Sequence, residues 1–178
     1  MEQIIELIKI ILPAVLVFIT AWVLLEKYLK HLPIKQDSNV LEAERLKILL
    51  PLQLSAYERL TIFMERIQPG SLVFRHNDIS RSSARTQLEL LKAVREEYEH
   101  NMSLQIYVSD DAWKFVIAAK DEVIEMIKLA GGKVGPDAGA MDFNRQLLEF
   151  DAQIKEGAVK RALKFLNLEI KIILGQSR

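Results

Sequence analysis

The chain has 178 residues, with 24 basic and 24 acidic side chains and no cysteine. This length accommodates one domain of ordinary size, or a small domain with an anchor. The lack of cysteine excludes disulfides, thiolate metal sites and cysteine nucleophiles, and the zero net charge argues against a general nucleic-acid binder.

The first predicted element is an apolar helix near the N-terminus. Residues 10–25 carry no charged side chain, but a helix of this length is about 24 Å long, less than the roughly 30 Å of a bilayer core. Residues 7–25 are long enough to span if Lys9 reaches outward toward the headgroups. We therefore predict a transmembrane anchor in residues 1–30, with the membrane helix over Ile4–Tyr28.

Two alternatives compete with a retained anchor: a cleaved signal peptide and a buried helix of a soluble protein. A signal peptide begins with positive charge and ends in a small-residue cleavage site, whereas this chain begins with Glu2 and Glu6. We favour the anchor. Because Lys27, Lys30 and Lys35 follow the apolar run, the positive-inside rule places the C-terminal part in the cytoplasm.

A linker and a helical domain are predicted after the anchor. Residues 31–37 contain Pro33, which stops the anchor helix, and the helical domain covers residues 38–178. Its first helix extends to about Gln68, with a kink or break near Pro51. After this proline, apolar side chains recur at spacings of three and four and form one helix face: Leu54, Tyr57, Leu60, Phe63, Met64 and Ile67.

The middle of the domain reads as two long helices. Residues 69–79 predict a turn followed by an irregular segment, and Ser80–Ser83 offer N-caps for the first long helix. Ser109, followed by two aspartates, is the predicted N-cap of the second. That helix is expected to end at Gly131-Gly132, within a flexible connection over residues 131–139.

The last pattern runs from Ala140 to Leu174 and predicts a long C-terminal helix, although Gly157 leaves open whether it is one helix or two. No segment shows the alternation of a strand. The predicted fold is therefore all-α, with one N-terminal transmembrane helix followed by a cytoplasmic bundle of about four to five helices.

The C-terminal pattern carries a nearly unbroken apolar stripe. Such stripes belong first of all to a core, but in a small domain part of one can pack against a second copy or a partner. The candidate interface residues are Phe143, Leu147, Phe150, Ile154, Leu166, Ile170 and Ile173.

Catalytic and cofactor patterns are poorly supported. Glu97 and His100 have the spacing of di-iron helices, which need a second such pair. Ser103 lies three residues after His100, a weak nucleophile signal, and the glycines of residues 131–135 lack the phosphate-loop pattern. We predict no catalytic residue, no metal site and no cofactor.

One basic cluster is a candidate site for an anion or an anionic lipid. Arg75, His76, Arg81 and Arg85 precede or begin the first long helix. Arginines at such a place can hold a phosphate or carboxylate. The alternative is a solvated loop with local pairs such as Asp78 with Arg81.

Several short segments carry a family resemblance. They are residues 54–60, 65–69, 95–101 and 105–109, with Ala112-Trp113. With them, roughly residues 5–170 resemble a family of bacterial single-pass membrane proteins of unknown function. The resemblance implies an N-terminal anchor, a helical cytoplasmic domain and the bacterial inner (cytoplasmic) membrane. It implies no activity, cofactor or catalytic residue.

The functional expectation is a non-enzymatic, membrane-anchored scaffold or accessory subunit. Its partners would be the membrane and a protein, either a second copy or another subunit of a membrane complex, and no nucleic acid. The first alternative is a helical domain that senses a ligand or an anionic lipid. The second is a metal-binding helical enzyme centred on Glu97 and His100.

Overall fold

The computed structural model describes the backbone of residues 2–30 and 36–175, and the side chains of residues 13–28 and 44–175. This described part holds seven α-helices and one 3₁₀ helix and no strand, so the predicted all-α class is confirmed. The chain divides into two compact units, residues 1–48 and residues 49–178. Each is described by itself.

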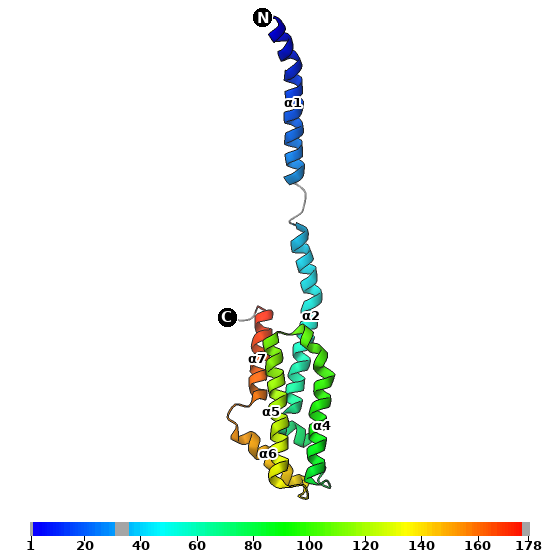
Figure 1. The fold of residues 1–178 in the computed structure, drawn as a ribbon, viewed down its shortest axis with the longest axis vertical. Helices are drawn as coiled ribbons and strands as arrows, with labels where there is room; N and C mark the ends of the chain where they lie inside the picture. Colours follow the sequence, from blue (N-terminus) through cyan, green and yellow to red (C-terminus); the bar gives the residue numbers. More distant parts are fainter. Residues whose placement is uncertain (1, 31–35, 176–178) are drawn as a thin grey trace. The chain divides into compact units, whose positions relative to one another are not determined.

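Helix α1, Glu2–Lys30, is a single helix with Pro13 inside it (Figure 1). Among the residues whose side chains are described, no helix is long and apolar enough to cross a membrane. The predicted transmembrane helix over Ile4–Tyr28 is therefore not supported. The part of that span before Pro13 lies outside the described side chains, and residues 31–35 of the predicted linker lie outside the described residues.

Helix α2, Gln36–Ile67, continues through Pro51, where we expected a kink or break. A proline removes one backbone hydrogen bond from a helix. Pro51 is exposed, so water can solvate the carbonyl that loses its partner. The expected apolar face after this proline is confirmed, because Tyr57, Leu60 and Ile67 are buried.

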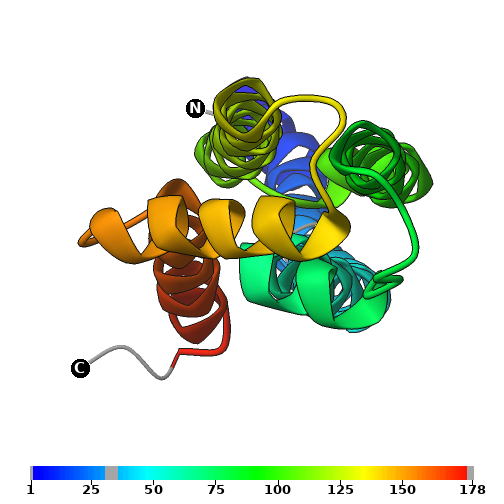
Figure 2. The same cartoon turned by 90° about the horizontal axis from the view of Figure 1, so that it is seen from below.

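The unit of residues 49–178 is a bundle with helices laid across one end. The C-terminal part of α2 lies beside α4 (Ser83–Asn101), α5 (Asp110–Val134) and α7 (Ala158–Ile173) (Figures 1 and 2). Helix α6, Ala140–Gln153, crosses the end of the bundle and contacts α3, Pro69–Arg75. The largest fully buried side chains come from all six helices: Leu60, Phe63, Met64 and Ile67 of α2, Leu72 of α3, Leu90 and Val94 of α4, Val116 and Ile127 of α5, Phe143 and Leu147 of α6, and Leu166 of α7.

The caps that the sequence predicted are present at two helix starts. The Ser82 side chain accepts a hydrogen bond from the Arg85 N–H, and the Ser109 side chain accepts one from the Ala112 N–H at 3.0 Å. A 3₁₀ helix, Met102–Tyr107, joins α4 to α5. Helix α5 continues past the two glycines where we expected it to end, and the turn falls at Gly135, whose φ of 87° favours glycine.

The structure decides whether the predicted C-terminal helical pattern is one long helix or two. It is two helices, α6 and α7, separated at residues 154–157. Gly157 is the N-cap of α7 and offers no side chain. Glu122 of α5 replaces that cap, because its carboxylate accepts a hydrogen bond from the Ala158 N–H at 2.6 Å.

The predicted interface stripe lies inside the bundle. Phe143, Leu147 and Leu166 are buried in the core. The other four members, Phe150, Ile154, Ile170 and Ile173, are partly buried and pack against it. The stripe therefore contributes to the core of this chain's own fold.

Candidate functional site

A short helix places two basic residues opposite α4. Pro69 begins α3, where its missing N–H costs no helical hydrogen bond. Leu72 is fully buried and fixes α3 on the core. The helix ends after one further turn, so Arg75 is its last residue and His76 its C-cap, with the His76 N–H bonded to the Leu72 carbonyl.

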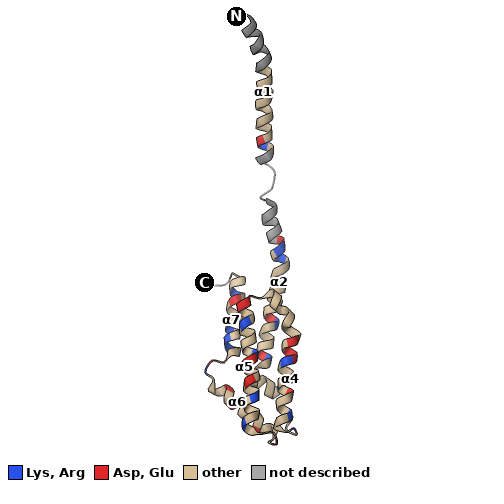
Figure 3. Cartoon of the chain, in the orientation of Figure 1, with Lys and Arg blue, Asp and Glu red and all other residues tan. Residues whose placement is uncertain are grey.

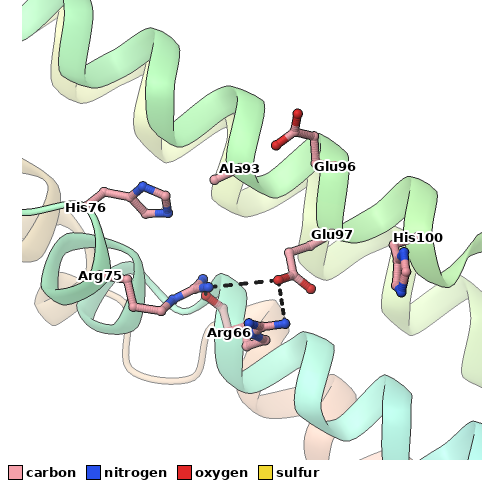
Figure 4. A pocket seen from close by; sticks show the side chains of 7 residues that line it. All are labelled: Arg66, Arg75, His76, Ala93, Glu96, Glu97 and His100. Atoms are coloured by element: carbon pink, nitrogen blue, oxygen red, sulfur yellow. Dashed lines mark hydrogen bonds and ion pairs between the residues drawn. The ribbon is translucent and has the colours of Figure 1, made fainter.

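These residues line a cavity of about 360 Å³ between α2, α3 and α4 (Figure 4). Arg66 comes from the last turn of α2, and four further lining residues come from one side of α4. The full lining is Arg66, Arg75, His76, Ala93, Glu96, Glu97 and His100.

Glu97 is the centre of the cavity's ion pairs. Its Oε1 lies 2.8 Å from Nη1 of Arg66 and 3.9 Å from Nη1 of Arg75, as the dashed lines in Figure 4 show. The Glu97 side chain is 18 % exposed, against 51 % for Arg66, so solvent screens the pair from one side only. Arg75 also donates to the Arg66 carbonyl at 2.7 Å, which fixes α3 to the end of α2.

His76 sits where the neutral imidazole is favoured. Burial lowers the pKa of His76 below its ordinary 6.5, and the neighbouring Arg75 and Arg81 lower it further, while Glu89 opposes them. Glu89 lies 3.8 Å from Nδ1 of His76. At neutral pH the cavity therefore contains His76 uncharged, with both ring nitrogens able to take part in hydrogen bonds.

The structure gathers only part of the predicted basic cluster. Arg75 and His76 line the cavity, whereas Arg81 pairs with Asp78 at 3.0 Å and with Glu89 at 3.9 Å. Arg85 is exposed and does not line the cavity. The pairing of Asp78 with Arg81 is the local pair named as the alternative from sequence.

The sequence did not identify Arg66 as a site residue, and it did not place Glu97 and His100 in one cavity with the arginines. Arg66 lies in the last turn of α2 just before the turn at Pro69, and that position was the only available signal. Glu97 was considered as a metal ligand or as part of a solvated helix face, and His100 as a metal ligand or as the neighbour of Ser103. Among the described residues, no group of three His, Asp or Glu side chains could hold a metal ion.

A second hollow of about 140 Å³ adjoins the cavity along the groove between α2 and α4. It shares Arg66, Glu97 and His100 with the cavity, and Arg59 of α2 adds a further cation. A carboxylate at Glu97 therefore lies on the boundary between two hollows, each of which has its own arginine.

A model of a family of unknown function, DUF7935, matches residues 2–173. The chain belongs to that family. The match agrees with the resemblance as far as an uncharacterised family is concerned, and it supports neither an anchor nor a bacterial origin. Searches of curated proteins and of solved structures found no match.

Proposed function

We propose that this DUF7935 protein is a non-enzymatic scaffold or accessory subunit that α1 anchors in a membrane. The supporting observation is the apolar surface of α1. Of its described side chains, nine large apolar ones are 49–68 % exposed, namely Val15, Leu16, Val17, Phe18, Ile19, Trp22, Val23, Leu24 and Leu25. Figure 3 shows the described part of this helix almost without charge.

Exposure of such an apolar surface to water is unfavourable. At about 25 cal/mol for each Å² of apolar surface removed from water, covering these side chains is favourable by on the order of 10 kcal/mol. Lipid is the cover that fits an apolar surface on every side of the helix. The charge-free run of residues 10–25 favours insertion into a membrane, and the flanking lysines favour an orientation with the helical domain in the cytoplasm. The bacterial inner membrane remains part of this proposal through the family resemblance alone.

The assembly role has support on the bundle. Leu168 and Ile172 of α7 are more than half exposed, and Leu168 lines a shallow hollow of about 410 Å³. Helices α4, α5 and α7 carry both signs of charge (Figure 3), a surface suited to a protein partner more than to a polyanion.

Two lysines placed in α1 test the anchor. In Val17→Lys/Leu24→Lys the apolar surface is interrupted at two points, and each lysine costs about 3 kcal/mol in a bilayer. We expect the wild type to stay in the membrane pellet after carbonate extraction and the double variant to be released. Leu88→Lys/Leu129→Lys, two exposed positions on the bundle, is the matched control and should stay in the pellet.

The same preparation tests orientation and assembly. Because the chain has no cysteine, one introduced at the exposed Gln153 is the only thiol to label, and labelling from the cytoplasmic side alone is expected. Extraction of the wild type by carbonate contradicts the anchor. A strictly monomeric protein in mild detergent, with no stoichiometric partner, contradicts the scaffold role.

A second candidate function is the sensing of an anionic ligand or lipid by the helical domain. The cavity of Arg66 and Arg75 favours it, because two guanidinium groups converge there on one carboxylate.

A further inference from the structure

We propose that the cavity between α2, α3 and α4 binds a phosphate group, and that the Glu97 carboxylate occupies its two arginines until the phosphate group displaces it. This inference rests on the second candidate function and names the class of ligand and the competing group. Its starting point is the pairing of one carboxylate oxygen with both Arg66 and Arg75.

The two arginines have more donors than their protein partners use. Together they have six guanidinium nitrogens, and the contacts of the described residues engage three of them: Nη1 of each arginine with Glu97, and Nη2 of Arg75 with the Arg66 carbonyl. A phosphate group has several acceptor oxygens and pairs with arginine through two hydrogen bonds at a time. A bound phosphate group can therefore accept hydrogen bonds from the guanidinium nitrogens that the Glu97 oxygen and the Arg66 carbonyl do not engage.

The cavity has the size for a small phosphorylated group. Its volume is about 360 Å³, near the lower end of ligand sites, which begin at about 300 Å³. Ala93 lies one helical turn before Glu97 and contributes only a methyl group to the lining. His76, which follows Arg75 in the chain, also lines the cavity. Its neutral imidazole adds a further hydrogen-bond donor.

The Glu97 carboxylate can move toward the adjoining hollow when a phosphate group displaces it from the two arginines. The adjoining hollow of about 140 Å³ is lined by Glu97 and by Arg59, so a carboxylate that leaves Arg75 keeps a cation nearby. The exchange then does not strand a carboxylate without a partner, which would be the main cost of displacement.

Two exposed apolar residues that are close in the chain to Arg75 and His76 decide which phosphate sources to test. Phe74 precedes Arg75 and is 86 % exposed, and Ile79 in the connection to α4 is 66 % exposed. Side chains of this kind beside a phosphate site suit a lipid headgroup, whose acyl chains they can contact. A free phosphorylated molecule would use the same arginines without them.

The test titrates the full chain in uncharged detergent with inorganic phosphate at neutral pH, following the Nε–H resonances of Arg66 and Arg75. Glu97→Gln removes the competing charge and keeps the shape, so its Kd for phosphate is expected to fall at least about tenfold. Arg75→Gln should raise the Kd by a similar factor. Arg145→Gln, an exposed arginine of α6, is the control and should leave the Kd unchanged.

A further variant keeps the test valid if loss of the ion pairs disturbs the fold. Ala93→Leu fills the cavity and leaves Arg66 and Glu97 in place, and it should abolish phosphate binding while thermal unfolding stays cooperative. A Kd that is equal in wild type and Glu97→Gln contradicts displacement but leaves the binding function intact. If no phosphate-dependent shift occurs in any variant, both the displacement of Glu97 and the sensing of an anionic ligand by this cavity are wrong.

Two arms separate the sources of the phosphate group. In one, the micelles contain phosphatidylglycerol; in the other, glycerol 3-phosphate is added to the solution. If lipid is the source, doped micelles shift both arginine resonances, and Phe74→Ser with Ile79→Ser weakens that effect without changing the Kd for inorganic phosphate. If the free molecule is the source, these two substitutions change neither arm.

Discussion

At the scale of single residues, Tyr57 shows how a buried polar group ties three helices together. Its side chain comes from α2 and the residue is 3 % exposed. Glu169 of α7 and Ser109, at the start of α5, lie close enough to its hydroxyl to shift its pKa. Burial, and then Glu169, raises the pKa of Tyr57 from 10.0 to about 12. The neutral hydroxyl is thus the form that the fold requires.

This raised pKa predicts a loss of stability in alkali. The stability that comes from the neutral Tyr57 is complete below pH 10, where the unfolded chain also keeps its proton, and it is lost as the pH rises through about 12. We expect urea unfolding to show this fall for the wild type, and Tyr57→Phe to lack most of it. Absorbance at alkaline pH should show one tyrosine that ionises later than the others.

The same variant should be less stable at neutral pH. Tyr57→Phe takes a buried hydroxyl away from the neighbourhood of Glu169, whose Oε2 is buried without a partner among the described residues, so we expect a cost of about 1–3 kcal/mol. Tyr107→Phe is the control, because Tyr107 is only partly buried whereas Tyr57 is 3 % exposed. Equal stability of the wild type and Tyr57→Phe at neutral pH contradicts the role of this hydroxyl.

The sequence could place Tyr57 on a buried face but not name its partner. The spacing of apolar side chains in α2 is local, and it predicted that face correctly. Glu169 lies more than a hundred residues away, so only the packing of α7 against α2 brings it to the hydroxyl. The same reason applies to Arg66 and Glu97 of the cavity. Charged residues of these types usually lie at the surface, and only the packing of α2 beside α4 brings the two together.

At the scale of helices, the two kinds of cap explain which boundaries the sequence could predict. Ser109 caps α5 from three residues away, so its pattern is visible in the chain. Helix α7 begins after Gly157 and is capped by Glu122, 36 residues earlier. That contact is not visible in the sequence, so the pattern of residues 140–174 and Gly157 left open whether there is one C-terminal helix or two.

Removing the distant cap should loosen the start of α7. Glu122 accepts from the Ala158 N–H at 2.6 Å and lies 3.6 Å from Arg161. We expect Glu122→Ala to lower the free energy of unfolding by about 1–2 kcal/mol, and amide exchange to accelerate in the first turn of α7. Glu125→Ala, which loses only an exposed pair with Lys128, should change little.

A second substitution separates the cap from the ion pair. In Glu122→Gln the amide oxygen can still accept from Ala158, while the attraction to Arg161 is gone. We expect most of the stability to remain. If Glu122→Gln is as unstable as Glu122→Ala, the ion pair and not the cap stabilises the start of α7.

At the scale of the whole chain, the absence of strand alternation was enough to predict an all-α fold. The number and packing of the helices were not predictable in the same way. Helix α3 is one case, because its seven residues begin with a Pro-Gly pair, which from sequence predicts a turn. Such a short helix has little stability of its own and forms because Leu72 is buried against the bundle.

The division of the chain into two units makes a prediction about where stability resides. Buried apolar side chains of the described residues begin at Ala56 and end at Leu166, all within the unit of residues 49–178. We expect a fragment of residues 49–178 to fold by itself, with cooperative thermal unfolding and a helical circular dichroism spectrum. Starting the fragment at residue 62 removes Tyr57 and Leu60 from the core, and each such loss costs about 2–5 kcal/mol, so that fragment should not unfold cooperatively. If the longer fragment is also unfolded, then residues 1–48 contribute to the stability of the bundle, and the apolar surface of α1 has a role beyond anchoring.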